Sequence, residues 1–232
     1  MDNAINILCT GQIESSLIEI AADNNIEIEV SPFIKTESIE TVEVQQEIEN
    51  ALLLSATVVF TSMNAVEAVA NYMFEEQPDW KIYCIGNATR ELAEKYFGDS
   101  LITGFADNAT ELAELIIEES GAEEIIFFCG NQRRNELPNM LSENNIEVYE
   151  IEVYETIALP HKISKIYHGI LFFSPSAVDS FFKLNKIDEQ TILFSIGNTT
   201  ENAIKKHSKS KIIVSDTPSK ETLIEKMIEY FT

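Results

Sequence analysis

The chain repeats itself at an interval of more than one hundred residues. Residues 60–66 (FTSMNAV) return 112 positions later as 172–178 (FFSPSAV), and residues 85–89 (IGNAT) return 111 positions later as 196–200 (IGNTT). Solenoids and propellers repeat every ~20–50 residues, so this longer period is typical of one small domain made twice. Two domains that carry matching polar loops favour a ligand site between them.

A second kind of segment also recurs, because Asn24-Asn25-Ile26-Glu27 is matched 120 positions later by Asn144-Asn145-Ile146-Glu147. Two kinds of segment therefore alternate, at about 1–36, 37–120, 121–156 and 157–232. Contiguous halves would divide near residue 120. A swapped arrangement, in which the two middle segments form one domain and the two outer segments form the other, is equally allowed by the repeat.

Composition limits the class of protein. The 232 residues are 45% hydrophobic, which is enough for each half to bury its own core. We expect no membrane span, since no apolar run reaches ~18 residues, and no signal peptide, since the start lacks a basic region followed by an apolar one. An odd and sparse set of cysteines predicts free, buried thiols in a reducing cytoplasm (Cys9, Cys84 and Cys129).

The chain is strongly acidic, with 39 acidic against 16 basic residues and a formal charge of −23. This charge repels nucleic acid and anionic lipid, so neither is expected as a partner. If the ligand is itself an anion, its site has to be built locally from backbone N–H groups and helix N-termini.

Short apolar runs alternate with amphipathic stretches. The runs are rich in Ile, Val and Phe without polar alternation, which is typical of strands buried on both faces of a parallel sheet. Apolar residues spaced three and four apart, such as Val66, Val69 and Met73, predict helices between them, and Thr217-Pro218-Ser219 predicts a helix start with proline near the first turn. The order indicates an α/β fold with parallel sheets flanked by helices. Strands are expected at 5–10, 26–33, 57–61, 81–85, 100–103, 124–129, 146–153, 169–173, 191–196 and 211–215.

Polar segments follow four of these strands and lead into helices. Ser62–Asn64 and Ser174–Ser176 form one matching pair, and Gly86–Thr89 and Gly197–Thr200 form the other. Serine or asparagine in such positions can cap a helix, and the N–H groups of the first turn can face an anion at the carboxyl ends of the strands. One such turn alone favours simple capping, whereas two matched pairs favour a shared ligand.

Several familiar chemistries have no motif here. His161, His168 and His207 form no cluster with metal-ligand spacing, so we expect no metal site. The sequence also contains no nucleotide-binding glycine motif and no nucleophile elbow of a hydrolase.

Two features near predicted strand ends each leave two interpretations open. Arg133 and Arg134 either bind anionic groups or pair with surface acids. Tyr154 follows the strand predicted at 146–153, close to a possible crossing between domains. It either packs as a half-buried aromatic residue or places its phenol in a cleft, where the phenol donates a hydrogen bond or a proton.

At these residues the chain resembles the uroporphyrinogen-III synthase family of tetrapyrrole biosynthesis. Two departures from the family pattern stand out. The family's first strand usually ends in Thr-Arg, whereas this chain reads Cys9-Thr10-Gly11-Gln12 and lacks that cation, and Asn198 replaces the proline of a later Gly-Pro-Thr turn. The matching segments occur in the family's order and span nearly the whole chain, at 59–66, 85–89, 130–134, 153–156, 172–176 and 196–200.

The resemblance implies the swapped architecture. One domain would comprise residues 1–34 and 158–232, the second 37–153, and two extended linkers would lie at 35–36 and 154–157. It also implies a cytoplasmic hydro-lyase that cyclises hydroxymethylbilane, a substrate with eight carboxylates, to uroporphyrinogen III. Water is lost and the terminal pyrrole ring is inverted. The family uses no metal or organic cofactor, so we expect none, and we expect a monomer.

The resemblance further implies which residues form the site. Tyr154 would help the substrate hydroxyl leave, and Thr89 would assist from a facing loop. Holding the substrate ends in the productive geometry is worth ~7–11 kcal/mol at best, so little acid–base chemistry is needed beyond a proton donor. The residues implied to hold the substrate are Ser62, Asn64, Gly86, Asn87, Arg133, Ser174, Ser176, Gly197, Thr199 and Thr200.

Two alternatives stay open on the sequence. A non-enzymatic two-domain protein that binds a small anion would carry the same duplicated loops. A family member with a regulatory role is the other alternative, motivated by the missing arginine next to Gly11.

Overall fold

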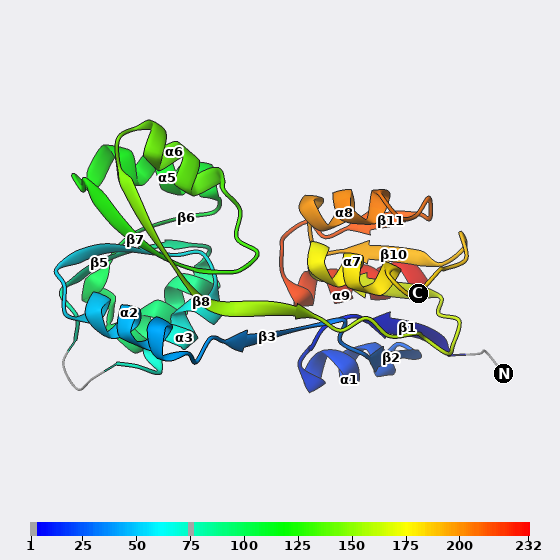
Figure 1. Ribbon diagram of the computed structural model, residues 1–232. Helices are drawn as coiled ribbons and strands as arrows, with labels where there is room; N and C mark the ends of the chain where they lie inside the picture. The colour runs from blue at the N-terminus through cyan, green and yellow to red at the C-terminus, as the bar shows by residue number, and fades with distance from the viewer. Residues whose placement is uncertain (1–3, 74–76) are drawn as a thin grey trace. The chain divides into compact units, whose positions relative to one another are not determined.

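The computed structural model describes residues 4–73 and 77–232. The chain forms two compact units, and each is an α/β structure with its own sheet (Figure 1). Unit 1 contains Met1–Lys35 and Ile157–Thr232, and unit 2 contains Thr36–Thr156. The predicted α/β class is confirmed, and the two sheets are mostly parallel and flanked by helices.

Unit 1 has a five-stranded parallel sheet in the order β11-β10-β9-β1-β2. Helices α1 (Ser15–Asp23) and α9 (Lys220–Phe231) pack on one face, and α7 (Pro175–Phe182) and α8 (Asn198–Lys205) pack on the other. The strands are β1 (Ile5–Cys9), β2 (Ile26–Val30), β9 (Gly169–Phe172), β10 (Ile192–Ser195) and β11 (Ile212–Val214).

Unit 2 has a six-stranded sheet in the order β3-β8-β7-β4-β5-β6. Helices α2 (Val42–Leu52), α3 (Met63–Ala70) and α4 (Asn87–Phe97) pack on one face, and α5 (Ala109–Glu119) and α6 (Glu136–Glu143) pack on the other. The strands, with a short 3-10 helix η1 (Asp99–Leu101) before β6, are β3 (Ile34–Ser38), β4 (Ala56–Phe60), β5 (Trp80–Ile85), β6 (Ile102–Ala106), β7 (Glu124–Gly130) and β8 (Glu147–Ala158).

The central strands are apolar on both faces because each face meets a layer of helices. In β7, Ile126 and Phe128 enter the core beneath α3 and α4, whereas Ile125, Phe127 and Cys129 enter the core beneath α5 and α6. Burying one large apolar side chain stabilises the fold by roughly 1.5–3 kcal/mol relative to leaving it exposed. Alternate residues of the strand are thus buried in two different cores, which explains why the run shows no polar alternation.

Strands β3 and β8 carry the chain between the units. The boundary falls between Lys35 and Thr36 in β3 and between Thr156 and Ile157 in β8. Backbone bonds join Ile39 N to Val153 O (2.9 Å) and Leu159 N to Phe33 O (2.8 Å). Residue numbers rise along one strand as they fall along the other, so the two strands run antiparallel.

Two strand predictions need correction. Hydrophobic periodicity misses β3, because Lys35, Thr36 and Glu37 leave it without an apolar run. The strand predicted at 146–153 in fact continues to Ala158, since the chain keeps pairing beyond residue 153. Tyr154 therefore lies inside a strand and does not follow one.

Two helix starts differ from expectation, because Asn87 and Asn198 are the first residues of α4 and α8 and the preceding glycines occupy the cap positions. The helix start predicted at 217–219 is confirmed, since Ser219 caps α9 and Pro218 directly precedes it. Across residues 4–73 and 77–232, none of the helices is both long enough and apolar enough to cross a membrane.

Candidate active site

Unit 2 has a pocket of about 400 Å³ at the carboxyl edge of its sheet. Strands β4, β5, β6 and β7 are parallel, so the loops that follow them meet at this edge. Thr61 follows β4, Asp107 follows β6 and Arg133 follows β7, while Tyr154 reaches the pocket from β8. This is the edge of an open α/β sheet at which ligands bind.

The ring of Tyr154 lies directly against the backbone of Gly130. A Cβ atom added to Gly130 would be 2.4 Å from Tyr154 Cζ and 2.5 Å from Cε2, far inside van der Waals contact. The two residues are partners in the β7–β8 ladder, where the register shifts between Cys129 and Gly130. Only glycine leaves room for this approach, so the ring position depends on residue 130 having no side chain.

The loop after β7 also holds the backbone at Tyr154 and at Thr156. Asn131 N donates to Tyr154 O (3.2 Å), and Asn131 Oδ1 accepts from Thr156 N (2.9 Å). Gln132 Nε2 donates to Thr156 O (3.2 Å). These three bonds hold the main chain at and after Tyr154, and the contact with Gly130 positions its ring.

Arg133 lines the same pocket as part of an ion pair. Its Nε donates to a carboxylate oxygen of Glu150 on β8, and this hydrogen bond raises the pKa of the Arg133 guanidinium above its ordinary value. Asp107 and Glu136 add carboxylates to the lining. The pocket therefore mixes both signs of charge, and the structure realises for Arg133 the pairing with an acid that the sequence left open.

The other residues expected in unit 2 occupy helix starts beside this edge. Ser62 caps α3, and its hydroxyl accepts from Asn64 N (3.2 Å). Gly86 has φ +80°, and Asn87 after it is exposed. Thr89 is only 6% exposed. None of these residues lines the pocket, which brings together only Arg133 and Tyr154 of the expected set.

The residues expected in unit 1 form the matching helix starts of that unit. Ser174 caps α7, and its hydroxyl accepts from Ala177 N (3.2 Å), with Ser176 two residues on. Gly197 precedes α8 with φ 179°, an extended conformation that any residue adopts. Thr199 is exposed, whereas Thr200 is 3% exposed, like its counterpart in α4.

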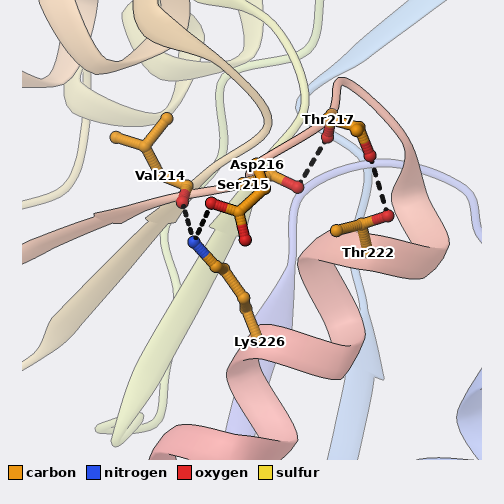
Figure 2. A network of polar contacts seen from close by, with 6 residues as sticks. All are labelled: Val214, Ser215, Asp216, Thr217, Thr222 and Lys226. Atoms are coloured by element: carbon orange, nitrogen blue, oxygen red, sulfur yellow. Dashed lines mark hydrogen bonds and ion pairs between the residues drawn. The ribbon is translucent and has the colours of Figure 1, made fainter.

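A hydroxyl-rich loop after β11 completes the carboxyl edge of unit 1, and sequence reasoning found only its helix start. Figure 2 shows Lys226 Nζ donating to Val214 O (3.0 Å) and to Asp216 Oδ1 (2.7 Å). Ser215 Oγ donates to Thr217 O (2.6 Å), and the Thr217 and Thr222 hydroxyls are 2.9 Å apart. The first turns of α9 thereby hold the loop in one conformation.

Lys220, in the first turn of α9, is a cation that sequence reasoning missed. Its Nζ lies 5.9 Å from the centre of the Phe173 ring, next to the cap residue Ser174, and its charge acts on the thiol of Cys9 at the end of β1. Within the described residues it makes no ion pair and is exposed. No local sequence pattern signals it, because its place near Phe173 depends on the sheet order of unit 1.

The cysteines are free and buried, as predicted. Burial raises the pKa of the Cys9 thiol to about 11, and of Cys84 and Cys129 to about 12, so all three stay protonated near neutral pH. In residues 4–73 and 77–232, no three His, Cys, Asp or Glu side chains gather in a way that could hold a metal ion.

Comparison with known proteins gives concordant results. A family model described as "Uroporphyrinogen-III synthase HemD" matches residues 15–225. The fold is similar to a mutant uroporphyrinogen III synthase from Thermus thermophilus in one crystal form (TM-score 0.69, 13% identity, 98% of each chain covered). It is also similar to the synthetase from Helicobacter pylori (TM-score 0.66, 16% identity, 97% of this chain and 99% of that chain). The wild-type Thermus thermophilus enzyme in a second crystal form gives a TM-score of 0.54 at 15% identity, with 98% of each chain covered.

Proposed function

This chain belongs to the uroporphyrinogen-III synthase family, and from that premise we propose that it cyclises hydroxymethylbilane to uroporphyrinogen III in haem biosynthesis. The family match over residues 15–225 carries the proposal. In the reaction the C–O bond of the terminal hydroxymethyl group breaks and the oxygen leaves as water. The pyrrole ring at the other end of the chain then attacks the resulting carbon through its own substituted carbon and forms a spiro intermediate. This intermediate rearranges, and the macrocycle closes with the attacking ring inverted and one ring proton lost.

We assign the proton donor to Tyr154. The pyrrole nitrogen supplies the electrons that expel the hydroxyl, so the protein needs only to give the departing oxygen a proton or a strong hydrogen bond. Tyr154 suits this role because it lines the pocket of unit 2 and is held from Gly130, Asn131 and Gln132. Thr89 is the second candidate, and its contact with substrate would require the first turn of α4 to open, since the residue is 6% exposed.

We propose that polar groups at the carboxyl edges of both sheets bind the substrate carboxylates. Helix starts suit this task, since their unpaired N–H groups and dipoles favour anions. Lys220 adds a charged anchor to unit 1. Its ammonium group lies over the ring of Phe173, and its charge acts on Cys9, close to the position where the family's first strand usually carries arginine. The remaining anchors are Ser62, Asn64, Gly86, Asn87, Arg133, Ser174, Ser176, Gly197, Thr199 and Thr200. Contact between Thr200 and substrate would require the first turn of α8 to open, since the residue is 3% exposed.

The proposal is tested by supplying hydroxymethylbilane to the purified chain and resolving the uroporphyrinogen isomers by chromatography. Closure without the enzyme gives isomer I, so a no-protein reaction is the control. Predominant isomer III supports the synthase. Isomer I alone, at the rate of the control, would support the alternative of a non-enzymatic protein that binds a small anion.

We further propose that the enzyme works as a monomer in the cytoplasm. The three free, buried thiols support a reducing compartment. Light scattering of the purified chain tests the monomer, for which the expected mass is 26.1 kDa. Fractionation of the source cells tests the compartment.

A further inference from the structure

Unit 1 has a pocket of about 500 Å³ at the amino edge of its sheet. The loops from α7 to β10 and from α8 to β11 line it. Because β9, β10 and β11 are parallel, this edge is opposite the one that carries Ser174 and Gly197. A ligand here would occupy a site separate from the carboxyl edge of the same sheet.

Basic side chains dominate the lining of this pocket, which includes Lys186, Lys205, Lys206, His207 and Lys209. Glu189 is the sole acidic residue among the described residues that line it. This cluster of basic side chains contrasts with the formal charge of −23 of the whole chain. It creates a local positive potential against the overall field.

Three of these lysines lack an acidic partner. Lys205 pairs with Glu201 (2.7 Å), and His207 Nε2 lies 2.9 Å from Asp179 Oδ1. By contrast, the described part of the chain offers Lys186, Lys206 and Lys209 no ion pair. Their ammonium groups are therefore available to a ligand.

Helix ends account for only part of this arrangement. Lysines in the last turn of a helix are favoured by its dipole, which suffices for Lys205 and Lys206 at the end of α8. Lys186 and Lys209 lie outside helices, in the two connecting loops. Like charges gathered around one pocket repel each other, and a bound anion would relieve that repulsion.

We propose that this pocket binds a compact phosphorylated small molecule through its di- or triphosphate group. Lysine ammonium groups act as mobile point charges that suit phosphate oxygens. The pocket volume falls within the ~300–1,000 Å³ of small-molecule sites. A long polyanion is disfavoured, because it would extend from the pocket over the acidic surface of the rest of the chain.

Isothermal titration with inorganic tripolyphosphate at constant ionic strength tests the site. The wild-type chain should bind the probe saturably at one site. The triple variant Lys186→Gln/Lys206→Gln/Lys209→Gln should bind at least about tenfold more weakly, since it removes the three unpaired charges. The matched control, Lys162→Gln/Lys165→Gln/Lys211→Gln, removes the same charge from the same unit and should change the affinity less than about twofold.

The circular dichroism of each variant reports whether it folds, and backbone amide shifts map the site in the wild type. Shifts confined to residues 182–189 and 205–209 support the proposal. Non-saturable binding by the wild type, or an equal loss of affinity in the two triple variants, would overturn it. Shifts centred on residues 174–176 and 197–200 would also overturn it, by placing the probe at the opposite edge.

Discussion

The two units repeat one design but carry very different charge. Unit 1 has 11 basic and 14 acidic residues, a formal charge of −3, whereas unit 2 has 5 basic and 25 acidic residues, a formal charge of −20. A substrate with eight carboxylates is repelled by unit 2 and much less by unit 1, and at physiological salt this repulsion acts within ~8 Å. The difference favours a division of work in which unit 1 binds the carboxylates more strongly than unit 2 does, and unit 2 supplies the proton donor.

Removing the phenol of Tyr154 should have the largest effect on this division. Tyr154→Phe should lower kcat by about 100-fold or more, since a positioned proton donor contributes roughly 10²–10⁴. Stability should change little, because the ring contact with Gly130 remains. Tyr149→Phe on the same strand is the control; it removes only the bond to Glu47 (2.9 Å) and should keep full activity. Wild-type turnover in Tyr154→Phe would move the chemistry away from this pocket.

A side chain at Gly130 should displace that ring. Gly130→Ala should destabilise the protein by about 2–3 kcal/mol, the upper part of the range for overpacking, and should lower kcat. In the Tyr154→Ala background the same substitution should cost far less, since the ring that it meets is gone. Urea unfolding of the four variants measures this coupling. Strictly additive effects would mean that the close contact does not constrain the tyrosine.

The repeated glycines should respond differently although their motifs match. Gly86→Ala should cost about 1–2 kcal/mol, since φ +80° with ψ 150° is a region that L residues avoid. Gly197→Ala should cost less than about 0.5 kcal/mol, because its backbone is extended and a Cβ would meet nothing within 4 Å. Unfolding followed by circular dichroism gives both values. Equal costs would show that the two turns are equivalent after all.

Alkaline pH should weaken unit 2 more than unit 1. These thiols have a pKa of about 11 or 12 in the fold and ~8.5 when unfolded. Between those values the thiol keeps its proton in the folded state and loses it in the unfolded state. Stability is therefore complete below pH ~8.5 and falls as the pH rises toward the folded values. From pH 8 to 9 the loss should be about 1 kcal/mol in unit 2, which has two such thiols, and about half of that in unit 1.

Urea unfolding followed by Trp80 fluorescence reports on unit 2, since Trp80 is the single tryptophan of the chain. Replacing Cys84 and Cys129 by alanine supplies the control and should flatten the pH dependence of that transition. An unchanged slope in this double variant would assign the effect to other groups.

The smallest predicted effect belongs to the cation of unit 1. Lys220→Gln should raise KM by about threefold with kcat unchanged, as expected for one exposed charge contact. Lys162→Gln serves as the control for charge and should leave KM unaltered. The increase should shrink as salt is added. A fall in kcat at constant KM would place Lys220 in the chemistry instead of in anchoring.

The sequence alone predicts the features that depend on local pattern. Apolar runs locate the central strands because both faces of the sheets are buried, and Ser62 and Ser174 cap helices as their types suggest. The sequence could not place Arg133 against Glu150, 17 residues away, because that pair depends on the β7–β8 register. Lys220 was missed for the same reason, since it approaches Cys9 only through the sheet order of unit 1.

Features that depend on exposure were also out of reach. Thr89 and Thr200 belong to polar, loop-like motifs, yet both are nearly buried. Each is the third residue of its helix, and in both helices this residue lies on the buried side. A short polar motif does not reveal which residue of the first helical turn faces the core.

The most direct test of the division of work is a parallel measurement of kcat and KM for Tyr154→Phe and Lys220→Gln on hydroxymethylbilane. We predict that kcat falls only in the unit 2 variant and that KM rises only in the unit 1 variant. The reverse pattern, or a loss of kcat in both variants, would contradict the account.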